Sequence, residues 1–103
     1  MTKLAMISQP MNGLTNYQIQ LVKKDAEKYL HDNGWEVRNT FFGEFPLAND
    51  PETKQIPVAY LAKSIEEMSK CDGVYFCDGW QNARGCVIEH NIAQAYGLEI
   101  IKD

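Results

Sequence analysis

Four short runs of residues that read as strands, separated by three longer segments with helical periodicity, constrain the fold of this chain more than any other sequence feature. The runs at 3–8, 73–77 and 98–101 are mainly apolar, and the run at 35–39 alternates apolar and polar residues. Strands this short and apolar favour a parallel sheet, in which each connection is a right-handed crossover through a helix. The sequence therefore predicts one α/β domain over residues 1–103, a three-layer sandwich with a four-stranded parallel sheet of order 2-1-3-4 flanked by helices.

The segments between the strands carry the signals that begin and end helices. The expected helices are one capped by Asn16 and stopped at 33–34, one with Pro57 in its first turn and stopped at 71–73, and one opening at Asn82 or just after it and ending near 96–97. Residues 40–56 carry glycine, proline, asparagine and aspartate without a period. We expect them to form a long loop.

The charge balance indicates the kind of partner that the protein binds. The 103 residues carry 14 acidic and 10 basic side chains, a formal net charge of −4. Such a chain has no general field that attracts a polyanion, so we expect a small-molecule ligand and no duplex nucleic acid. No run approaches the roughly 18 apolar residues of a membrane span, and the apolar residues 4–7 are too few for a signal peptide. We therefore expect a soluble, cytoplasmic protein with no membrane partner.

The cysteine and histidine patterns disfavour a metal site. Three cysteines without a Cys-x-x-Cys motif argue against a disulfide framework and against zinc, and they fit a reducing compartment. Of the two histidines, His90 follows Cys86 by four residues, but no third ligand of suitable spacing accompanies them. We expect no metal and no cofactor.

The strand order also predicts where a ligand binds. In a sheet of order 2-1-3-4, neighbouring connections leave toward opposite faces between the first and third strands, and ligands bind beyond the carboxyl ends of the strands at that point. The loops that leave these two strands, at 8–15 and 78–84, are the richest in glycine, proline, asparagine and polar residues. The expected ligand contacts are Ser8, Pro10, Met11, Asn12, Gly13, Trp80, Asn82, Arg84 and Gly85.

The spacing of motif residues excludes several other functions that proteins of this architecture carry out. The phosphate-binding motif G-x-x-x-x-G-K-[ST] and the dinucleotide motif G-x-G-x-x-G are both absent. Six residues separate Cys77 from Arg84, one more than a cysteine phosphatase loop holds, so Cys77 is interpreted as a small buried strand residue. Ser8 and Gln9 stand where a phosphoacceptor receiver domain has paired acids.

Glu89 is the most distinctive candidate, because it falls in an early turn of the third expected helix, whose N-terminus points into the expected cleft. The helix dipole there stabilises an ionised carboxylate. Apolar residues such as Val87, Ile88 and Ile92 surround it in sequence. Two interpretations stay open: an exposed helix residue that caps the helix or pairs with Arg84, and a functional carboxylate.

Two motifs carry a family resemblance: I-S-Q-P-M-N-G-L at 7–14 and C-D-G-V-Y-F-C-D-G-W-Q-N-A-R-G-C-V-I-E-H at 71–90. Over nearly its whole length the chain resembles the nucleoside 2-deoxyribosyltransferase-like superfamily, with its flavodoxin-like fold, and within it a branch of small bacterial and phage proteins. The resemblance implies that Glu89 is a nucleophile that attacks the anomeric carbon of a nucleoside or nucleotide. Transfer of the sugar to a second base, or to water, then makes the protein a glycosyltransferase or a hydrolase.

The chain departs from the family pattern at three positions. Gln9 stands where the branch usually has Gly, Ser64 where many relatives carry Asp, and Ala83 where relatives place Ser or Asp. These changes remove groups that contact sugar, phosphate or base, so they imply an altered substrate or a weakened catalyst.

Several candidate residues have a functional and a structural interpretation. Asp78 is suited to assist proton transfer to the leaving base, or to turn the chain before Gly79. Trp80 is suited to stack on a base or to be buried under the long loop, and Arg84 to bind phosphate or to pair with a surface acid. Gly85 either admits a ligand close to the backbone or packs at a helix start.

Phe41, Phe42 and Phe45 are too apolar for a free loop. They are interpreted as a lid over the cleft or as a contact with a second subunit. Because relatives complete their sites across a dimer, we expect a homo-oligomer.

Two functions from different classes follow. The first is an enzyme that acts on the N-glycosidic bond of a nucleoside or nucleotide, which Glu89, Gly85 and Arg84 favour. The second is a non-catalytic module that binds a nucleotide or related metabolite in the same cleft, which the loss of acidic groups at Ser64 and Ala83 favours.

Overall fold

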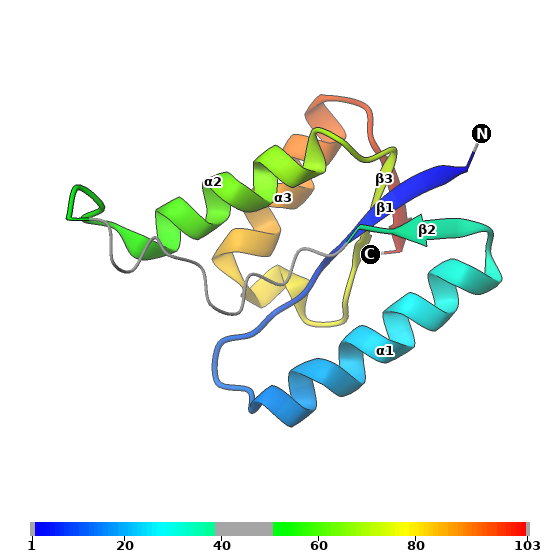
Figure 1. Cartoon of the computed structure of the whole chain (residues 1–103), viewed down its shortest axis with the longest axis horizontal. Coiled ribbons are helices and arrows are strands. Elements are labelled where there is room, and N and C mark those ends of the chain that lie inside the picture. Colours follow the sequence, from blue (N-terminus) through cyan, green and yellow to red (C-terminus); the bar gives the residue numbers. More distant parts are fainter. Residues whose placement is uncertain (1, 39–50, 103) are drawn as a thin grey trace.

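The computed structural model describes residues 2–38 and 51–102. In them, four parallel strands form one sheet of order β2-β1-β3-β4, with helices on both faces (Figure 1). The elements are β1 (Lys3–Ser8), α1 (Asn16–Asp32), β2 (Trp35–Val37), α2 (Ile56–Met68), β3 (Gly73–Phe76), the 3-10 helix η2 (Trp80–Asn82), α3 (Arg84–Ala95) and β4 (Glu99–Lys102). The predicted α/β class and strand order are confirmed.

Side chains that alternate along β1 and β3 point to opposite faces of the sheet and build two cores. The core beneath α1 contains Ala5, Ile7, Ala26, Leu30, Trp35, Tyr75 and Cys77. The core on the other face contains Met6, Met68, Val74, Phe76 and Ala93. Because the first core includes residues of α1 and the second includes residues of α2 and α3, the molecule has three layers, which Figure 1 shows from the side.

The central pairing of β1 with β3 brings the carboxyl ends of these two strands together. Ser8 aligns with Phe76, and the N–H of Cys77 donates to the carbonyl of Ser8 at 2.9 Å. On the other side of β1, the N–H of Arg38 donates to the carbonyl of Ala5 at 2.8 Å and continues the pairing just beyond β2. The loops that follow β1 and β3 therefore leave from the same edge of the sheet.

The residue that caps the start of α1 differs from the one expected from the sequence. Thr15, not Asn16, caps α1: its hydroxyl accepts from the N–H of Gln18 at 3.1 Å, and the Gln18 side chain accepts from the N–H of Thr15 at 2.9 Å. This reciprocal pair is a capping box, and the Thr-x-x-Gln spacing was its signal. The expectation for Asn16 was wrong by one residue, whereas Pro57 does lie in the first turn of α2.

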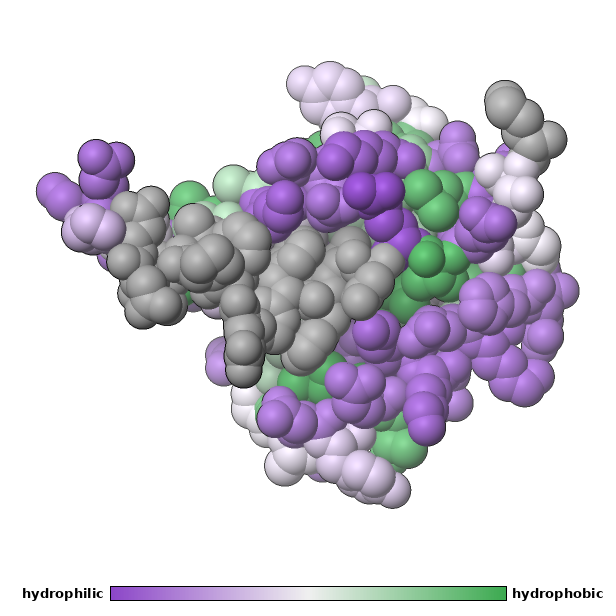
Figure 2. All heavy atoms as spheres, viewed as in Figure 1, coloured by the Kyte–Doolittle hydropathy of each residue, from purple (hydrophilic) through white to green (hydrophobic). Residues whose placement is uncertain are grey.

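Part of the predicted long loop lies outside the described residues, together with Asn39 and the Phe41, Phe42 and Phe45 cluster. Within the described part of the chain, no helix is both long and apolar enough to cross a membrane. The face seen in Figure 2 is mainly hydrophilic over α1, with its hydrophobic residues in small separate areas.

Candidate functional site

A pocket of about 260 Å³ lies at the carboxyl end of β1, between this strand, α2 and α3. It is lined by Ile7, Ser8, Gln9, Met11, Pro57, Tyr60, Leu61, Ser64, Gly85 and Glu89. Its volume is close to the lower end of small-molecule sites, which span about 300–1,000 Å³. The predicted contacts Ser8, Met11 and Gly85 and the predicted catalytic residue Glu89 therefore line one pocket.

Glu89 is buried, with 7% of its surface exposed, and both of its carboxylate oxygens accept hydrogen bonds. Ser8 donates to Oε1 at 3.3 Å and Ser64 donates to Oε2 at 2.9 Å. Burial raises the pKa of Glu89, and the hydrogen bonds from Ser64 and Ser8 oppose that rise because they favour the ionised form. The interpretation of Glu89 as an exposed helix residue was wrong.

The start of α3 explains why this carboxylate faces the pocket. Gly85 and Glu89 are four residues apart, so they lie on the same face of the helix. A Cβ at Gly85 would lie 3.9 Å from Leu61 Cδ1, an ordinary contact distance. Gly85 thus leaves a small open volume between α3 and α2, one turn before the carboxylate.

One face of α2 forms the opposite wall, and of its residues only Ser64 was singled out for the site from the sequence, as a departure from the family pattern. Pro57, Tyr60, Leu61 and Ser64 follow each other at spacings of three, one and three residues, which places them on one side of the helix. The same spacing was visible in the sequence. What it does not reveal is that this face lies opposite Glu89, 25 residues away from Ser64 along the chain.

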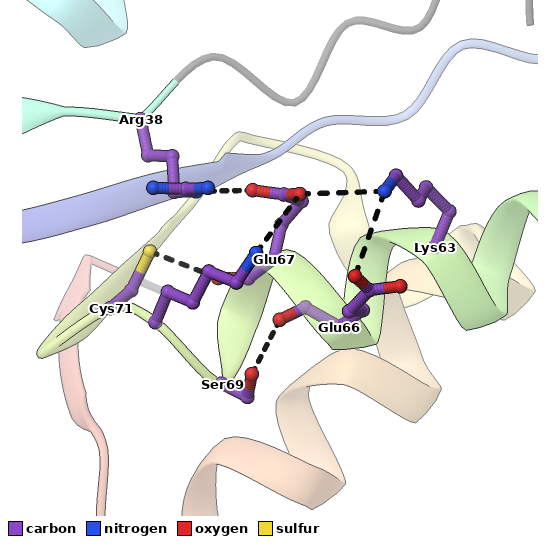
Figure 3. A network of polar contacts seen from close by, with 7 residues as sticks. Arg38, Lys63, Glu66, Glu67, Ser69 and Cys71 are labelled. Atoms are coloured by element: carbon purple, nitrogen blue, oxygen red, sulfur yellow. Dashed lines mark hydrogen bonds and ion pairs between the residues drawn. The ribbon is translucent and has the colours of Figure 1, made fainter.

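A network of charges holds α2 beside the sheet (Figure 3). Arg38, just after β2, donates through Nε to Oε2 of Glu67 in the last turn of α2. Lys63 and Lys70 lie 3.8 and 4.0 Å from the other carboxylate oxygen of Glu67. The hydrogen bond from Arg38 is the main cause that holds the pKa of Glu67 below its usual range. Since Glu67 follows Ser64 by three residues, the network fixes the part of α2 that faces Glu89.

Gln9 connects the same pocket to α1. Its side-chain amide donates to the carbonyl of Ile19 at 2.7 Å. A glycine at this position would have no such bond, so the departure from the family pattern gives the loop after β1 an attachment to the first turns of α1.

Asp78 and Trp80 lie apart from the pocket lining. The Asp78 side chain is 93% exposed and forms an ion pair with Lys102 at 3.3 Å. The Trp80 ring stacks on His90, with centroids 4.1 Å apart, and also packs against Phe76. Trp80 is half-buried and packs on two aromatic side chains of the fold. Most of the long loop under which it was expected to be buried lies outside the described residues, and any contact of Asp78 or Trp80 with substrate stays a prediction.

The remaining predicted contacts lie on two other parts of the surface. Asn82 and Arg84 line a second hollow of about 310 Å³ with Gln81, Val87 and Ile88. Pro10, Asn12 and Gly13 belong to the loop after β1 but not to the lining of the Glu89 pocket. Gly79 approaches this loop, since a Cβ there would lie 3.9 Å from Pro10 Cγ. The two predicted loops therefore meet, but only the loop after β1 contributes residues to the lining of the Glu89 pocket, and no residue of 78–84 does.

The cysteines near the site are poor nucleophiles. Burial raises the pKa of the Cys77 thiol to about 12, and burial also raises the pKa of Cys86 despite a hydrogen bond with Ser8. Both thiols are therefore protonated near neutral pH. Across residues 2–38 and 51–102, no group of three histidine, cysteine, aspartate or glutamate side chains is placed to hold a metal ion.

The arrangement suits one kind of chemistry: a buried carboxylate, held by two hydroxyl donors, reaches a pocket with largely apolar walls. Such a carboxylate, once ionised, attacks an electron-poor carbon. Comparisons with curated proteins and with solved structures find no match. A family model described as a domain of unknown function, DUF4406, matches residues 3–102. The chain therefore belongs to the DUF4406 family.

Proposed function

We propose that this protein cleaves or exchanges the N-glycosidic bond of a nucleoside or nucleotide, with Glu89 as the nucleophile. One observation carries the proposal: Glu89 lies buried in a pocket wall, and each carboxylate oxygen is oriented by one hydroxyl donor. The resemblance to nucleoside 2-deoxyribosyltransferases supports the same role for this residue. The apolar side chains of Ile7, Met11 and Leu61 suit the flat face of a base.

The proposed reaction has two displacements. In the first, a Glu89 oxygen forms a bond to the anomeric carbon while the C–N bond breaks and its electron pair leaves with the base, which takes up a proton. In the second, water or another base attacks the same carbon and gives up a proton to the solvent, while the bond from Glu89 to the sugar breaks and its electron pair returns to the carboxylate. Two inversions give net retention of configuration.

The leaving base needs a proton donor. Asp78 was the sequence-based candidate, yet its side chain is exposed and paired with Lys102. Its participation requires that this ion pair open and that the loop after β3 turn toward the pocket.

The other proposed properties accompany this function. We propose a small-molecule substrate, no cofactor or metal, and a homo-oligomeric assembly. A cytoplasmic location fits three cysteines that are all free thiols.

A non-catalytic nucleotide-binding module is the second candidate, and the position of Asp78 favours it. Among the described lining residues, Glu89 is the one carboxylate. A site of this kind binds a ligand through the pocket walls but has no second acid beside the glycosidic bond.

Incubation with a panel of deoxynucleosides and deoxynucleoside monophosphates separates the two candidates. Each substrate is supplied with and without a second base, and free or exchanged base is measured by chromatography. The enzyme releases base, and Glu89→Gln lowers turnover by several orders of magnitude while retaining ligand binding. Binding without release across the whole panel supports the binding module instead.

A further inference from the structure

Ser64 occupies a position from which it controls Glu89 directly. Its hydroxyl donates to Glu89 Oε2 at 2.9 Å, which is shorter than the 3.3 Å bond from Ser8 to the other oxygen. In many relatives that the chain resembles this position is an Asp, a second acid. A serine hydroxyl does not supply a proton near neutral pH, but it is a good donor to an anion.

We propose that Ser64 is a positioning residue, which holds the Glu89 carboxylate in one orientation and favours its ionised form. The inference rests on the proposed function for its catalytic meaning, but the contact itself exists without any substrate. A hydroxyl on Oε2 prevents the carboxylate from rotating and leaves the other directions of each oxygen open to the pocket.

The surroundings of Glu89 make the hydrogen bond from Ser64 important for the charge of its carboxylate. Burial raises the pKa of Glu89 and the hydrogen bonds from Ser64 and Ser8 both lower it, so these hydroxyl donors stabilise its charge. Titratable groups around it include the Cys86 thiol on α3, whose pKa is raised by burial and by the Glu89 charge, and the Tyr60 phenol on α2, which lines the same pocket. The Cys86 thiol is therefore protonated near neutral pH and adds no charge beside Glu89.

The position of α2 is coupled to Glu89 through the same bond. The Arg38–Glu67 contact holds α2 one turn after Ser64, and Tyr60 and Leu61 line the pocket one turn before it. A ligand that displaces this wall therefore changes the distance from Ser64 to the carboxylate.

The test is a direct titration of Glu89 that needs no turnover. Protein with carbon-13 labelled glutamate carboxylates is titrated by NMR, and Glu89→Gln assigns the Glu89 signal by its loss. Ser64→Ala should raise the Glu89 midpoint by about one pH unit, the value expected when one hydrogen bond to an ionised group is lost. Ser64→Thr, which keeps a hydroxyl, should restore most of the shift.

Ser69→Ala is the matched control, because Ser69 is the C-terminal cap of α2 and its hydroxyl donates to the carbonyl of Glu66. This variant should leave the Glu89 midpoint unchanged. If Ser64→Ala fails to fold, Ser64→Cys fills a similar volume with a weak donor and should raise the midpoint as well. An unchanged midpoint in a folded Ser64→Ala or Ser64→Cys protein overturns the proposal.

Turnover adds an independent readout when the enzyme is active. The acid limb of the pH profile of kcat should move upward with the NMR midpoint, and kcat should fall more than KM rises. If the wild type shows no turnover on any substrate, the proposed function is wrong. The NMR titration alone then decides the role of Ser64.

Discussion

Gly85→Ala should make the protein more stable and less active. Gly85 is the second residue of α3 and has no positive φ, so alanine fits its backbone. The added Cβ would meet Leu61 Cδ1 at 3.9 Å, which is ordinary contact. Inside a helix, alanine stabilises the folded state relative to glycine by about 0.5–1 kcal/mol. Near a helix end we expect about 0.5 kcal/mol, or about 2–4 °C in the melting temperature of a domain this size.

The same methyl group should interfere with ligand. It enters a pocket of about 260 Å³ and occupies roughly a tenth of it, if its volume is taken as one water molecule's share of about 30 Å³. A methyl group pressed against a filled site costs about 1–3 kcal/mol. The value of kcat/KM, or the affinity for a non-hydrolysed ligand, should therefore fall about 5- to 150-fold.

Thermal melting by circular dichroism checks the expected rise in stability, and calorimetry checks the expected loss of ligand affinity. Gly73→Ala is the contrasting control, because a Cβ there would lie 2.9 Å from Trp35 and 3.0 Å from the carbonyl of Glu99. It should lower the melting temperature. If Gly85→Ala destabilises the fold, or binds ligand as tightly as the wild type, the assigned role of Gly85 in the pocket wall is refuted.

Two further predictions concern the charge network and metal ions. Arg38→Met should lower the melting temperature at neutral pH. The Glu67 pKa is lowered in the folded protein, so the ionised carboxylate stabilises the wild type, and this stabilisation should be lost as pH falls below the usual range of a glutamate. The melting temperatures of the two proteins should therefore converge in acid. A constant difference in melting temperature down to acidic pH would contradict the assignment. Base release should be unaffected by a chelator, and activity abolished by the chelator and restored by one divalent ion would disprove metal independence.

The fold was predictable because it depends on local periodicity. Short strand-like runs separated by helical segments leave few topologies other than a parallel sheet with crossovers. The carboxyl-edge rule then located Ser8 and Glu89 near each other, although 81 residues separate them. Local rules placed these two residues because both belong to elements whose orientation the topology determines.

The rest of the site depends on contacts that no local pattern encodes. The wall from α2 is set by the approach of one helix to another, and by an ion pair between Arg38 and Glu67 across 29 residues. Asp78 follows β3 as expected, yet its exposed side chain turns to Lys102 at the end of β4. Side-chain direction in a loop is decided by whichever partner lies nearest in space, and the sequence order does not reveal that partner.

The most direct test of the central claim is the intact mass of the protein after incubation with a 2-fluorinated arabinosyl nucleoside. The fluorine destabilises the oxocarbenium-like transition states of both displacements, so an adduct accumulates where its formation is faster than its breakdown. We predict a mass increase equal to the fluorosugar in the wild type, with the label on Glu89, and no increase in Glu89→Gln. A label on another residue, or equal labelling of Glu89→Gln, would show that Glu89 is not the nucleophile.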